Sequence, residues 1–455
     1  MLNYIWLALV VLAVAIGGWN NRLSEVTAGA FDGAKTAVTI ALGLIGIMAL
    51  WLGVMRLAER AGLVQRIARG LRPIMRRLFP DVPPEHPAMG SMLMNMAANM
   101  LGLGNAATPL GLRAMRDLER LNPRPGVASN AMCTFLAINT ASVQLIPTTA
   151  IALLAAAGSA RPTAIVGTAL LATLCAATVA ITSARLLEKL PFFRLPETSP
   201  VAGVGDPGRD TAVTAGISDP GSTQPAEVPD NVIAVEPRGW RRFLPFLLVL
   251  FFLGLFVRLV FPGWFNLPAD PNTVAQNAFV RSVNTLSILA IPFLLSFFPV
   301  YAATRRIKVY EEFVEGAKEG FGVILKIIPF LVTMLVAISM FKGAGGIDLL
   351  TRLLTPVLTP LQFPPDLLPL ALMRPLSGSA TLALLTDIIH RLGPDNIVSL
   401  MAATIYGSTE TTFYVAAVYF GSVAVKQTRH AIPAGLLGDL AGVIASVVIC
   451  RVVFA

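Results

Sequence analysis

Long apolar runs, separated by shorter polar segments, make up most of this sequence. They lie at about residues 2–19, 34–55, 127–157, 163–187, 243–261, 282–303, 321–341, 397–421 and 432–451. An α-helix needs about 20 apolar residues to cross the hydrocarbon core of a bilayer, and most of these runs have that length. The composition agrees, because 55% of the residues are hydrophobic and only 13% are charged, whereas soluble domains carry about 25% charged residues. The pattern predicts an all-α integral membrane protein.

One long polar segment interrupts the apolar runs. Residues 196–237 are rich in proline, glycine, serine, threonine and aspartate and contain no aromatic residue. Such a composition cannot bury enough apolar surface to offset the entropy of ordering the chain. We therefore expect a disordered cytoplasmic linker at 191–241, which divides the chain into a first unit at 1–190 and a second unit at 242–455. The second unit should begin with an extra helix.

The two units contain similar short motifs in the same order. The clearest pairs are 31–35 with 314–318, 71–74 with 354–357, 107–108 with 380–381, and 142–144 with 408–410. Their shared order indicates an internal duplication. An odd number of predicted crossings separates equivalent helices, so we expect two inverted-topology repeats. Inverted repeats with broken helices that meet near the midplane are a common plan of secondary transporters.

Two segments, 88–115 and 370–391, are too polar and too rich in glycine and proline to face lipid as continuous helices. Irregular backbone at membrane depth is tolerated only where protein or a water-filled cavity surrounds it. Arginines flank the first segment on both sides, so we predict one re-entrant helical hairpin in each repeat. A stretch at 64–71, basic on one face and apolar on the other, predicts an interfacial amphipathic helix. Its counterpart is expected near 347–361.

The basic residues lie mainly between apolar runs, and the formal net charge is +9. Placing these clusters in the cytoplasm follows the positive-inside rule. We therefore expect a multi-pass protein of a bacterial inner membrane, with the N-terminus cytoplasmic and the C-terminus outside. Arg69 and Arg120 should be cytoplasmic and Asp270 external. Because topology explains the basic residues, no nucleic-acid partner is expected; the partners should be the lipid bilayer and a small polar solute.

A carboxylate lies near the middle of the apolar run at 397–421. Glu410 has the hydroxyl side chains of Ser408, Thr409 and Thr411 as neighbours. A charged group at this depth costs about 3 kcal/mol or more unless it is protonated, paired or facing water. We interpret Glu410 as part of a substrate or ion site. The alternative is a buried glutamate that is hydrogen-bonded to a neighbouring helix and serves packing.

Carboxamides and one arginine extend this candidate site. Asparagine and glutamine offer donors and acceptors together, which suits an uncharged polar or zwitterionic ligand, although amides also hold membrane helices together. Arg374 suits bidentate recognition of a carboxylate or phosphate; the alternative is a structural ion pair with Asp387, Glu410 or Asp439. These three acids are also the candidates for coupling to H⁺ or Na⁺. The expected solute-binding residues are Asn95, Asn99, Asn105, Thr108, Asn139, Gln144, Arg374, Ser377, Ser379, Ser408, Thr409, Glu410 and Thr411.

Motifs of several other protein classes are absent from the sequence. No G-x-x-x-x-G-K-[ST] phosphate-binding motif occurs. The three cysteines form no C-x-x-C pair, and the three histidines are far apart. We expect no enzyme activity, no cofactor and no metal site. A homo-oligomer is an open alternative to a monomer.

Two motifs carry a family resemblance. Residues 95–109, with the sequence NMAANMLGLGNAATP, resemble the signature of spore maturation protein A, and residues 406–414 together with 428–435 resemble that of spore maturation protein B. The chain thus resembles a natural fusion of the two, which covers nearly everything except the linker. Both belong to the Gate, or nucleoside-recognition, group, which is related to concentrative nucleoside transporters and to the membrane part of ferrous-iron transporters. The resemblance implies a transport-like fold.

The resemblance also bears on function. It implies that Asn99, Asn105, Gln144 and Glu410 occupy places comparable to those of ligand-holding residues in nucleoside transporters, but it does not fix the solute. Pattern and resemblance together predict a secondary transporter of a small polar solute, nucleoside-like or other, with ion coupling left open. The alternative is a non-transporting membrane scaffold or sensor linked to spore maturation or envelope physiology.

Overall fold

The computed structural model describes residues 2–193, 243–265, 277–346, 349, 352 and 363–454. Within these ranges the chain is α-helical, with short 3-10 turns and one isolated bridge between Val127 and Gln427, and it contains no β-strand. The all-α prediction is confirmed. Most of the predicted linker at 191–241 lies outside the described residues, as do Asp270 and nearly all of the predicted second interfacial helix at 347–361.

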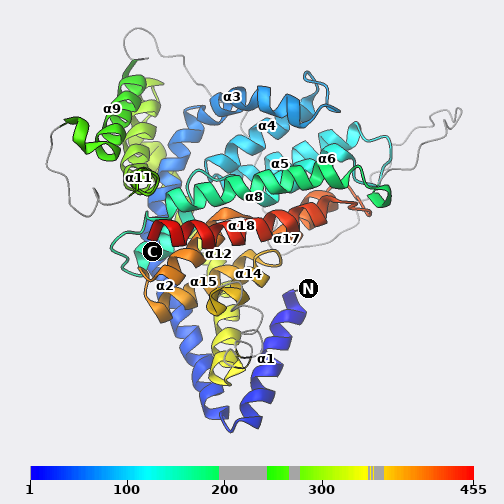
Figure 1. Ribbon diagram of the computed structural model, residues 1–455, viewed down its shortest axis with the longest axis vertical. Helices are drawn as coiled ribbons and strands as arrows, with labels where there is room; N and C mark the ends of the chain where they lie inside the picture. Colours follow the sequence, from blue (N-terminus) through cyan, green and yellow to red (C-terminus); the bar gives the residue numbers. More distant parts are fainter. Residues whose placement is uncertain are drawn as a thin grey trace, which may run out of the picture.

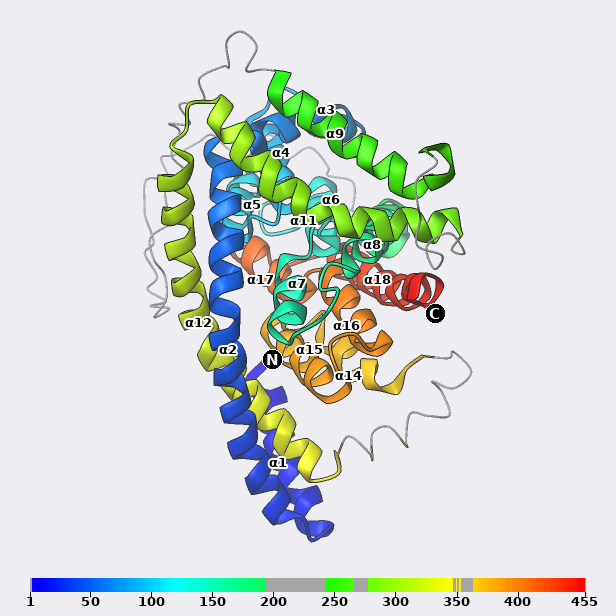
Figure 2. The same ribbon diagram turned by 90° about the vertical axis from the view of Figure 1, so that its left-hand side faces the viewer.

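Two long antiparallel helices follow the longest axis of the molecule (Figures 1 and 2). α2 (Leu23–Arg60) and α12 (Val309–Gly343) run side by side, and α1 (Leu2–Trp19) packs against one end of the pair. Glycines allow this close approach. A Cβ atom on Gly33, for example, would lie 2.6 Å from the carbonyl oxygen of Leu335, which is shorter than any relaxed contact. The α2–α12 pair joins the two halves of the chain.

A second pair of adjacent helices lies across the first pair in Figure 1. It consists of α8 (Ile165–Leu187) and α18 (Ala431–Phe454), and it also joins one half of the chain to the other. Alanine and glycine dominate the contact, and a Cβ on Gly438 would lie 2.8 Å from the Cβ of Ala180. Small residues at such contacts let membrane helices pack closely.

An outer pair of helices covers one side of this assembly. α9 (Phe243–Val260) packs against α11 (Ala278–Thr304) and exposes large apolar side chains, among them Phe246 at 63% and Leu250 at 53%. Such a surface suits lipid rather than water. Among the described residues, five helices are long and apolar enough to cross a membrane, namely α2, α8, α9, α11 and α18. The protein is therefore a multi-pass membrane protein.

Both predicted helical hairpins are present. α4 (Pro87–Met100) and α5 (Gly104–Arg120) form the first, and α14 (Leu368–Met373) and α15 (Gly378–Leu392) form the second. In each half, a long helix comes before the hairpin, and a broken helix and a final long helix follow it. This order agrees with the expected duplication. The inverted topology and the re-entrant placement stay predictions.

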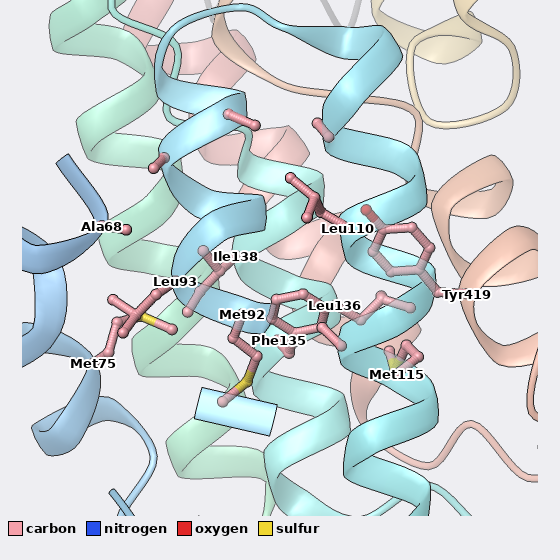
Figure 3. Close-up of a cluster of buried hydrophobic side chains, with 14 of the residues drawn as sticks. Ala68, Met75, Met92, Leu93, Leu110, Met115, Phe135, Leu136, Ile138 and Tyr419 are labelled. Carbon is pink, nitrogen blue, oxygen red and sulfur yellow. The ribbon is translucent and has the colours of Figure 1, made fainter. Parts of the chain in front are cut away.

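The helix predicted from the amphipathic stretch 64–71 is α3 (Leu63–Leu78). It exposes arginines on one face and buries Met75 on the other. Figure 3 shows Met75 in the core of the first half, together with side chains of the first hairpin, of the following helix and of Tyr419. Phe135 and Tyr419 are stacked there with ring centroids 6.0 Å apart, so this core includes a residue of the second half.

Two runs predicted as continuous helices are broken in the middle, which corrects the prediction. The run at 127–157 forms α6 (Asn130–Ala141) and α7 (Thr148–Ala156), and the run at 397–421 forms α16 (Ile397–Ser408) and α17 (Thr412–Gly421). The apolar pattern continues through both breaks, so composition alone does not show them. At these points the backbone needs other hydrogen-bond partners.

Candidate functional site

The break between α6 and α7 begins at Ser142, which has a left-handed conformation with φ of 37°. The hydroxyl of Thr173 on α8 donates to the carbonyl oxygens of Ala141 and Ser142, at 2.9 and 3.0 Å. The backbone N–H of Leu145 donates to the carbonyl oxygen of Met100 at 3.0 Å. Neighbouring elements therefore satisfy the polar groups released by the break, and the first hairpin is tied to it.

The break between α16 and α17 is an extended segment. Thr409 and Thr411 lie in the β region, with φ of −142° and −84°. The N–H of Glu410 donates to the carbonyl oxygen of Thr140 on α6 at 2.7 Å, and that of Phe413 donates to Pro375 in the second hairpin at 3.0 Å. Each break thus contacts a hairpin, and Glu410 contacts the end of α6 in the other half.

The two breaks also touch each other directly. Gly407 packs on Pro147, and a Cβ on Gly407 would lie 2.5 Å from the Cβ of Pro147. Gln144 Nε2 donates to Glu410 Oε1 at 3.3 Å. The sequence repeat pairs Gln144 with Glu410, and the structure confirms that these two side chains meet.

A cavity of about 160 Å³ lies where the breaks and the hairpin turns come together. Four segments far apart in the sequence contribute to its lining. The lining residues are Asn99, Gly102, Gln144, Pro147, Thr148, Thr149, Ala150, Arg374, Tyr406, Gly407 and Glu410. The cavity therefore contains carboxamides, hydroxyls, one guanidinium group and one carboxylate.

The guanidinium of Arg374 is held by Tyr406 rather than by an acid. Arg374 is 3% exposed, its Nη2 donates to the carbonyl oxygen of Tyr406 at 2.9 Å, and it lies 4.8 Å from the centroid of the Tyr406 ring. Among the described residues, no acid forms an ion pair with Arg374 within 4.0 Å, and its Nε has no hydrogen-bond partner. A cation and the carboxylate of Glu410 thus line one cavity without a direct ion pair.

The expected alternative of an Arg374–Asp387 pair is wrong. Asp387 lies two and a half turns along α15, where its carboxylate approaches Lys342 at 3.8 Å and Arg391 at 3.7 Å. The helix carries Asp387 away from the hairpin turn, at 1.5 Å per residue. Asp439 is also outside the cavity lining; it is 2% exposed and accepts a hydrogen bond of 2.6 Å from the hydroxyl of Thr412.

A network of buried amides supports the first hairpin. Asn99 Nδ2 donates to Asn139 Oδ1 at 2.8 Å, and Tyr419 donates to the same oxygen at 3.3 Å. Asn95 Nδ2 donates to the Tyr419 hydroxyl at 3.2 Å and to the carbonyl oxygen of Ala107 at 2.8 Å. Of these three asparagines only Asn99 lines the cavity. Asn95 and Asn139 therefore position the hairpin rather than contact the cavity.

The remaining predicted residues lie around the cavity but do not line it. Ser377 caps α15 by accepting from the N–H of Ala380 at 3.2 Å, and its hydroxyl lies 3.2 Å from that of Ser379. Ser408 accepts from Ser446 at 3.4 Å. Thr108, Thr409 and Thr411 are also absent from the lining, and the side chain of Asn105 lies outside the described part of the chain.

Several lining residues were not predicted from the sequence. Tyr406 carries neither a charge nor an amide, so the sequence did not indicate it as a site residue. It directly precedes Gly407, which also lines the cavity. Thr148 and Thr149 follow Pro147 at the start of α7. A proline followed by two threonines in an apolar run is a helix-start signal, and this signal could have indicated both the break and its lining.

Comparison with known proteins places these elements in a family. The family model described as Gate, nucleoside recognition, matches residues 41–157 and 324–426. One matched segment contains α4 to α7 and the other contains α14 to α17. The chain belongs to the Gate family. Every residue that lines the cavity lies within one of the two Gate segments, whereas Asp439 lies outside them.

Two curated relatives of this Gate protein come from Bacillus subtilis (strain 168). Spore maturation protein A is 48% identical over 194 residues, which cover 43% of this chain and 97% of the relative. Spore maturation protein B is 43% identical over 172 residues, which cover 38% of this chain and 97% of the relative. The matches agree with a fusion of two such proteins.

A solved structure gives a more distant match. The chain resembles the crystal structure of the YdaH transporter of Alcanivorax borkumensis, with 14% sequence identity and a TM-score of 0.37, over 98% of this chain and 96% of that one. A likeness at this level carries no functional argument.

Proposed function

We propose that this protein is a secondary transporter of a small polar solute and that the solute binds in the cavity between the two broken helices. The observation that carries the proposal is the meeting of both breaks at one polar cavity. Non-helical backbone inside a membrane protein is tolerated where it lines a cavity. In secondary transporters, discontinuous helices near the midplane commonly form the substrate and ion sites.

The chemistry of the lining favours a solute that carries an anionic group together with a basic group or a hydrogen-bond donor. Arg374 offers a guanidinium suited to a carboxylate or another anionic group. Glu410 and the amides of Asn99 and Gln144 offer acceptors and donors in the same lining. The volume of about 160 Å³ is below the roughly 300–1,000 Å³ typical of small-molecule sites. A small zwitterion fits this description better than a large, uncharged solute.

Coupling to H⁺ or Na⁺ would use the acids near the breaks. Glu410 lines the cavity, and Asp439 is buried beside Thr412 at the start of α17. Asp387 is the weaker candidate because Lys342 and Arg391 already lie close to its carboxylate. These positions favour Glu410 and Asp439 as the proposed sites of ion coupling.

The direct test is uptake by the purified protein in proteoliposomes. Nucleosides, amino acids and dicarboxylates would be supplied in turn under an imposed proton or sodium gradient. The proposal predicts uptake of at least one solute, abolished by collapse of the gradient. Failure of every solute to enter, together with no change in the melting temperature on adding any of them, would favour a non-transporting scaffold, a role that the names of the spore maturation relatives also fit.

We also propose that the protein lies in a bacterial inner membrane with its N-terminus in the cytoplasm. The basic clusters support this orientation under the positive-inside rule. Single cysteines at Arg120 and Asp270, in a variant lacking the three native cysteines, would be labelled in intact cells with an impermeant maleimide. We expect labelling at 270 and none at 120. The reverse pattern would contradict the orientation and the inverted repeat.

A further inference from the structure

A second cavity lies between α11 and the first half of the chain, and its character is apolar. Its volume is about 320 Å³, and its walls come from α2, α3, α8, α11, the first hairpin turn and the α6–α7 break. Leu145 and Leu286 line it and are 37% and 38% exposed, so the cavity opens at the outer surface of the helices. In a membrane that surface would face lipid tails.

One end of this cavity carries positive charge. Phe293 and Phe297 line the cavity, and the stack continues along α11 from Phe297 to Tyr301, with ring centroids 5.0 and 5.7 Å apart. Two guanidinium groups lie at the Tyr301 ring, that of Arg66 at 5.4 Å and that of Arg305 at 5.1 Å from its centroid. An apolar slot therefore leads along a row of aromatic rings to two cations.

The α3 side of the cavity lies next to the same positive charge. Leu63 and Ile67 line the cavity, and Arg66, which lies between them in the sequence, is an exposed residue. Arg306 and Lys308 are exposed and lie in the turn between α11 and α12. The positive-inside rule assigns this basic end to the cytoplasmic face, where the leaflet carries anionic lipids.

We propose that this cavity binds an anionic phospholipid, with one acyl chain between α11 and the first hairpin and the headgroup beside the exposed Arg66. Arg305 is only 4% exposed and adds positive charge beneath the surface. The cavity suits an acyl chain because its walls are almost entirely aliphatic and aromatic. The headgroup supplies the negative charge that complements the guanidinium group of Arg66. A neutral phospholipid with the same chains would fill the slot but lack net negative charge.

This site would lie next to the polar cavity. Met100 and Leu101 at the hairpin turn and Leu145 and Ile146 at the α6–α7 break line the apolar cavity. Pro147, the next residue, lines the polar cavity. An acyl chain in the slot would therefore press on the same turn and break that form the proposed solute site, so the lipid would stabilise one arrangement of them.

The test uses the purified full-length protein in mild detergent and measures melting as phospholipid is added. Dioleoyl phosphatidylglycerol is compared with dioleoyl phosphatidylcholine, which has the same chains, and with inorganic phosphate, which has none. We expect a larger stabilisation by phosphatidylglycerol than by phosphatidylcholine and none by phosphate. An equal effect of the two lipids, or an equal effect of phosphate, would overturn the proposal.

Three variants locate the effect. Arg66→Gln should weaken phosphatidylglycerol binding about fivefold, which corresponds to about 1 kcal/mol for a basic side chain near the membrane surface. Arg69→Gln is the matched control, because Arg69 is an exposed arginine of the same helix that lines a different surface cavity. Ala290→Phe fills the apolar cavity and should remove the effect of both lipids. Unchanged lipid preference in Arg66→Gln, or a loss equal to that in Arg69→Gln, would contradict this site.

Discussion

The carboxylate of Glu410 lies where one half of the chain meets the other. Its backbone N–H is bonded to α6 and its side chain accepts from Gln144, yet no described cation lies within 4.0 Å of it in an ion pair. The structural alternative therefore rests on the hydrogen bond from Gln144 and not on an ion pair. We propose that Glu410 acts on a solute or an ion.

Glu410→Gln tests this role. The amide can keep the contact with Gln144 and leaves no ion pair broken, so expression and melting temperature should match those of the wild type while transport falls at least tenfold. Glu315→Gln, at an exposed acid paired with Lys318, should change neither property. Poor expression of Glu410→Gln, rescued by adding Arg374→Gln, would instead indicate a structural pair worth about 3–5 kcal/mol.

Removal of one buried amide should lower the stability of the protein. Asn139→Ala removes the acceptor of both Asn99 and Tyr419 and leaves their donors without it. The free energy of unfolding in detergent should fall by about 1–2 kcal/mol. Tyr414→Phe, which alters an exposed tyrosine, serves as the control. Equal stability of Asn139→Ala and the wild type would show that the network contributes nothing.

At this scale the sequence predicts residue types better than contacts. The sequence repeat alone aligned Gln144 with Glu410, and the two side chains meet in the structure. It could not predict that Asn99 bonds Asn139, since that contact depends on how the hairpin packs on α6. Nor could it exclude Asp387 as the partner of Arg374, because the direction of α15 decides which acid approaches the guanidinium.

At the scale of elements, the two breaks are the main difference between sequence and structure. Apolar character continues through 127–157 and 397–421, so hydropathy predicts unbroken helices. The breaks exist because other elements supply partners for the released backbone groups, such as Thr173 for Ser142 and Thr140 for Glu410. Those partners are distant in sequence. The hairpins, in contrast, were predicted because glycine, proline and polar residues mark them locally.

The α2–α12 contact provides an element-scale prediction. A Cβ on Gly320 would lie 2.8 Å from the Cα of Ala49, whereas a Cβ on Gly322 would have no atom within 4 Å. Gly320→Leu should force the helices apart and lower the free energy of unfolding by about 1–3 kcal/mol. Gly322→Leu should have no such effect. The two variants should differ clearly in melting temperature; similar melting would mean that the pair does not depend on close packing.

At the scale of the molecule, contacts between the halves run along its whole length. They include the α2–α12 and α8–α18 pairs and the ion pair of Arg56 with Glu312 at 2.9 Å. The curated relatives cover the chain in two separate pieces, each matched over 97% of its own length. This single chain therefore corresponds to two separate proteins in Bacillus subtilis.

We therefore expect the halves to assemble without a covalent link. Residues 1–195 and 238–455, expressed as two chains with a tag on one, should co-purify at equal stoichiometry and melt as a single unit. The apolar surfaces of α2 and α12 would otherwise be left uncovered. Recovery of the tagged half alone would show that the segment between them is needed for assembly.

The measurement that tests the central claim most directly compares solute uptake before and after the cavity is filled. Thr149 lines the polar cavity, and Thr149→Trp would occupy most of its space; Thr178→Trp, on the exposed surface of α8, is the matched control. Proteoliposomes with the wild type and with Thr178→Trp should accumulate the same solute, while those with Thr149→Trp should accumulate none despite an unchanged melting temperature. Wild-type uptake by Thr149→Trp would show that the solute does not pass through this cavity.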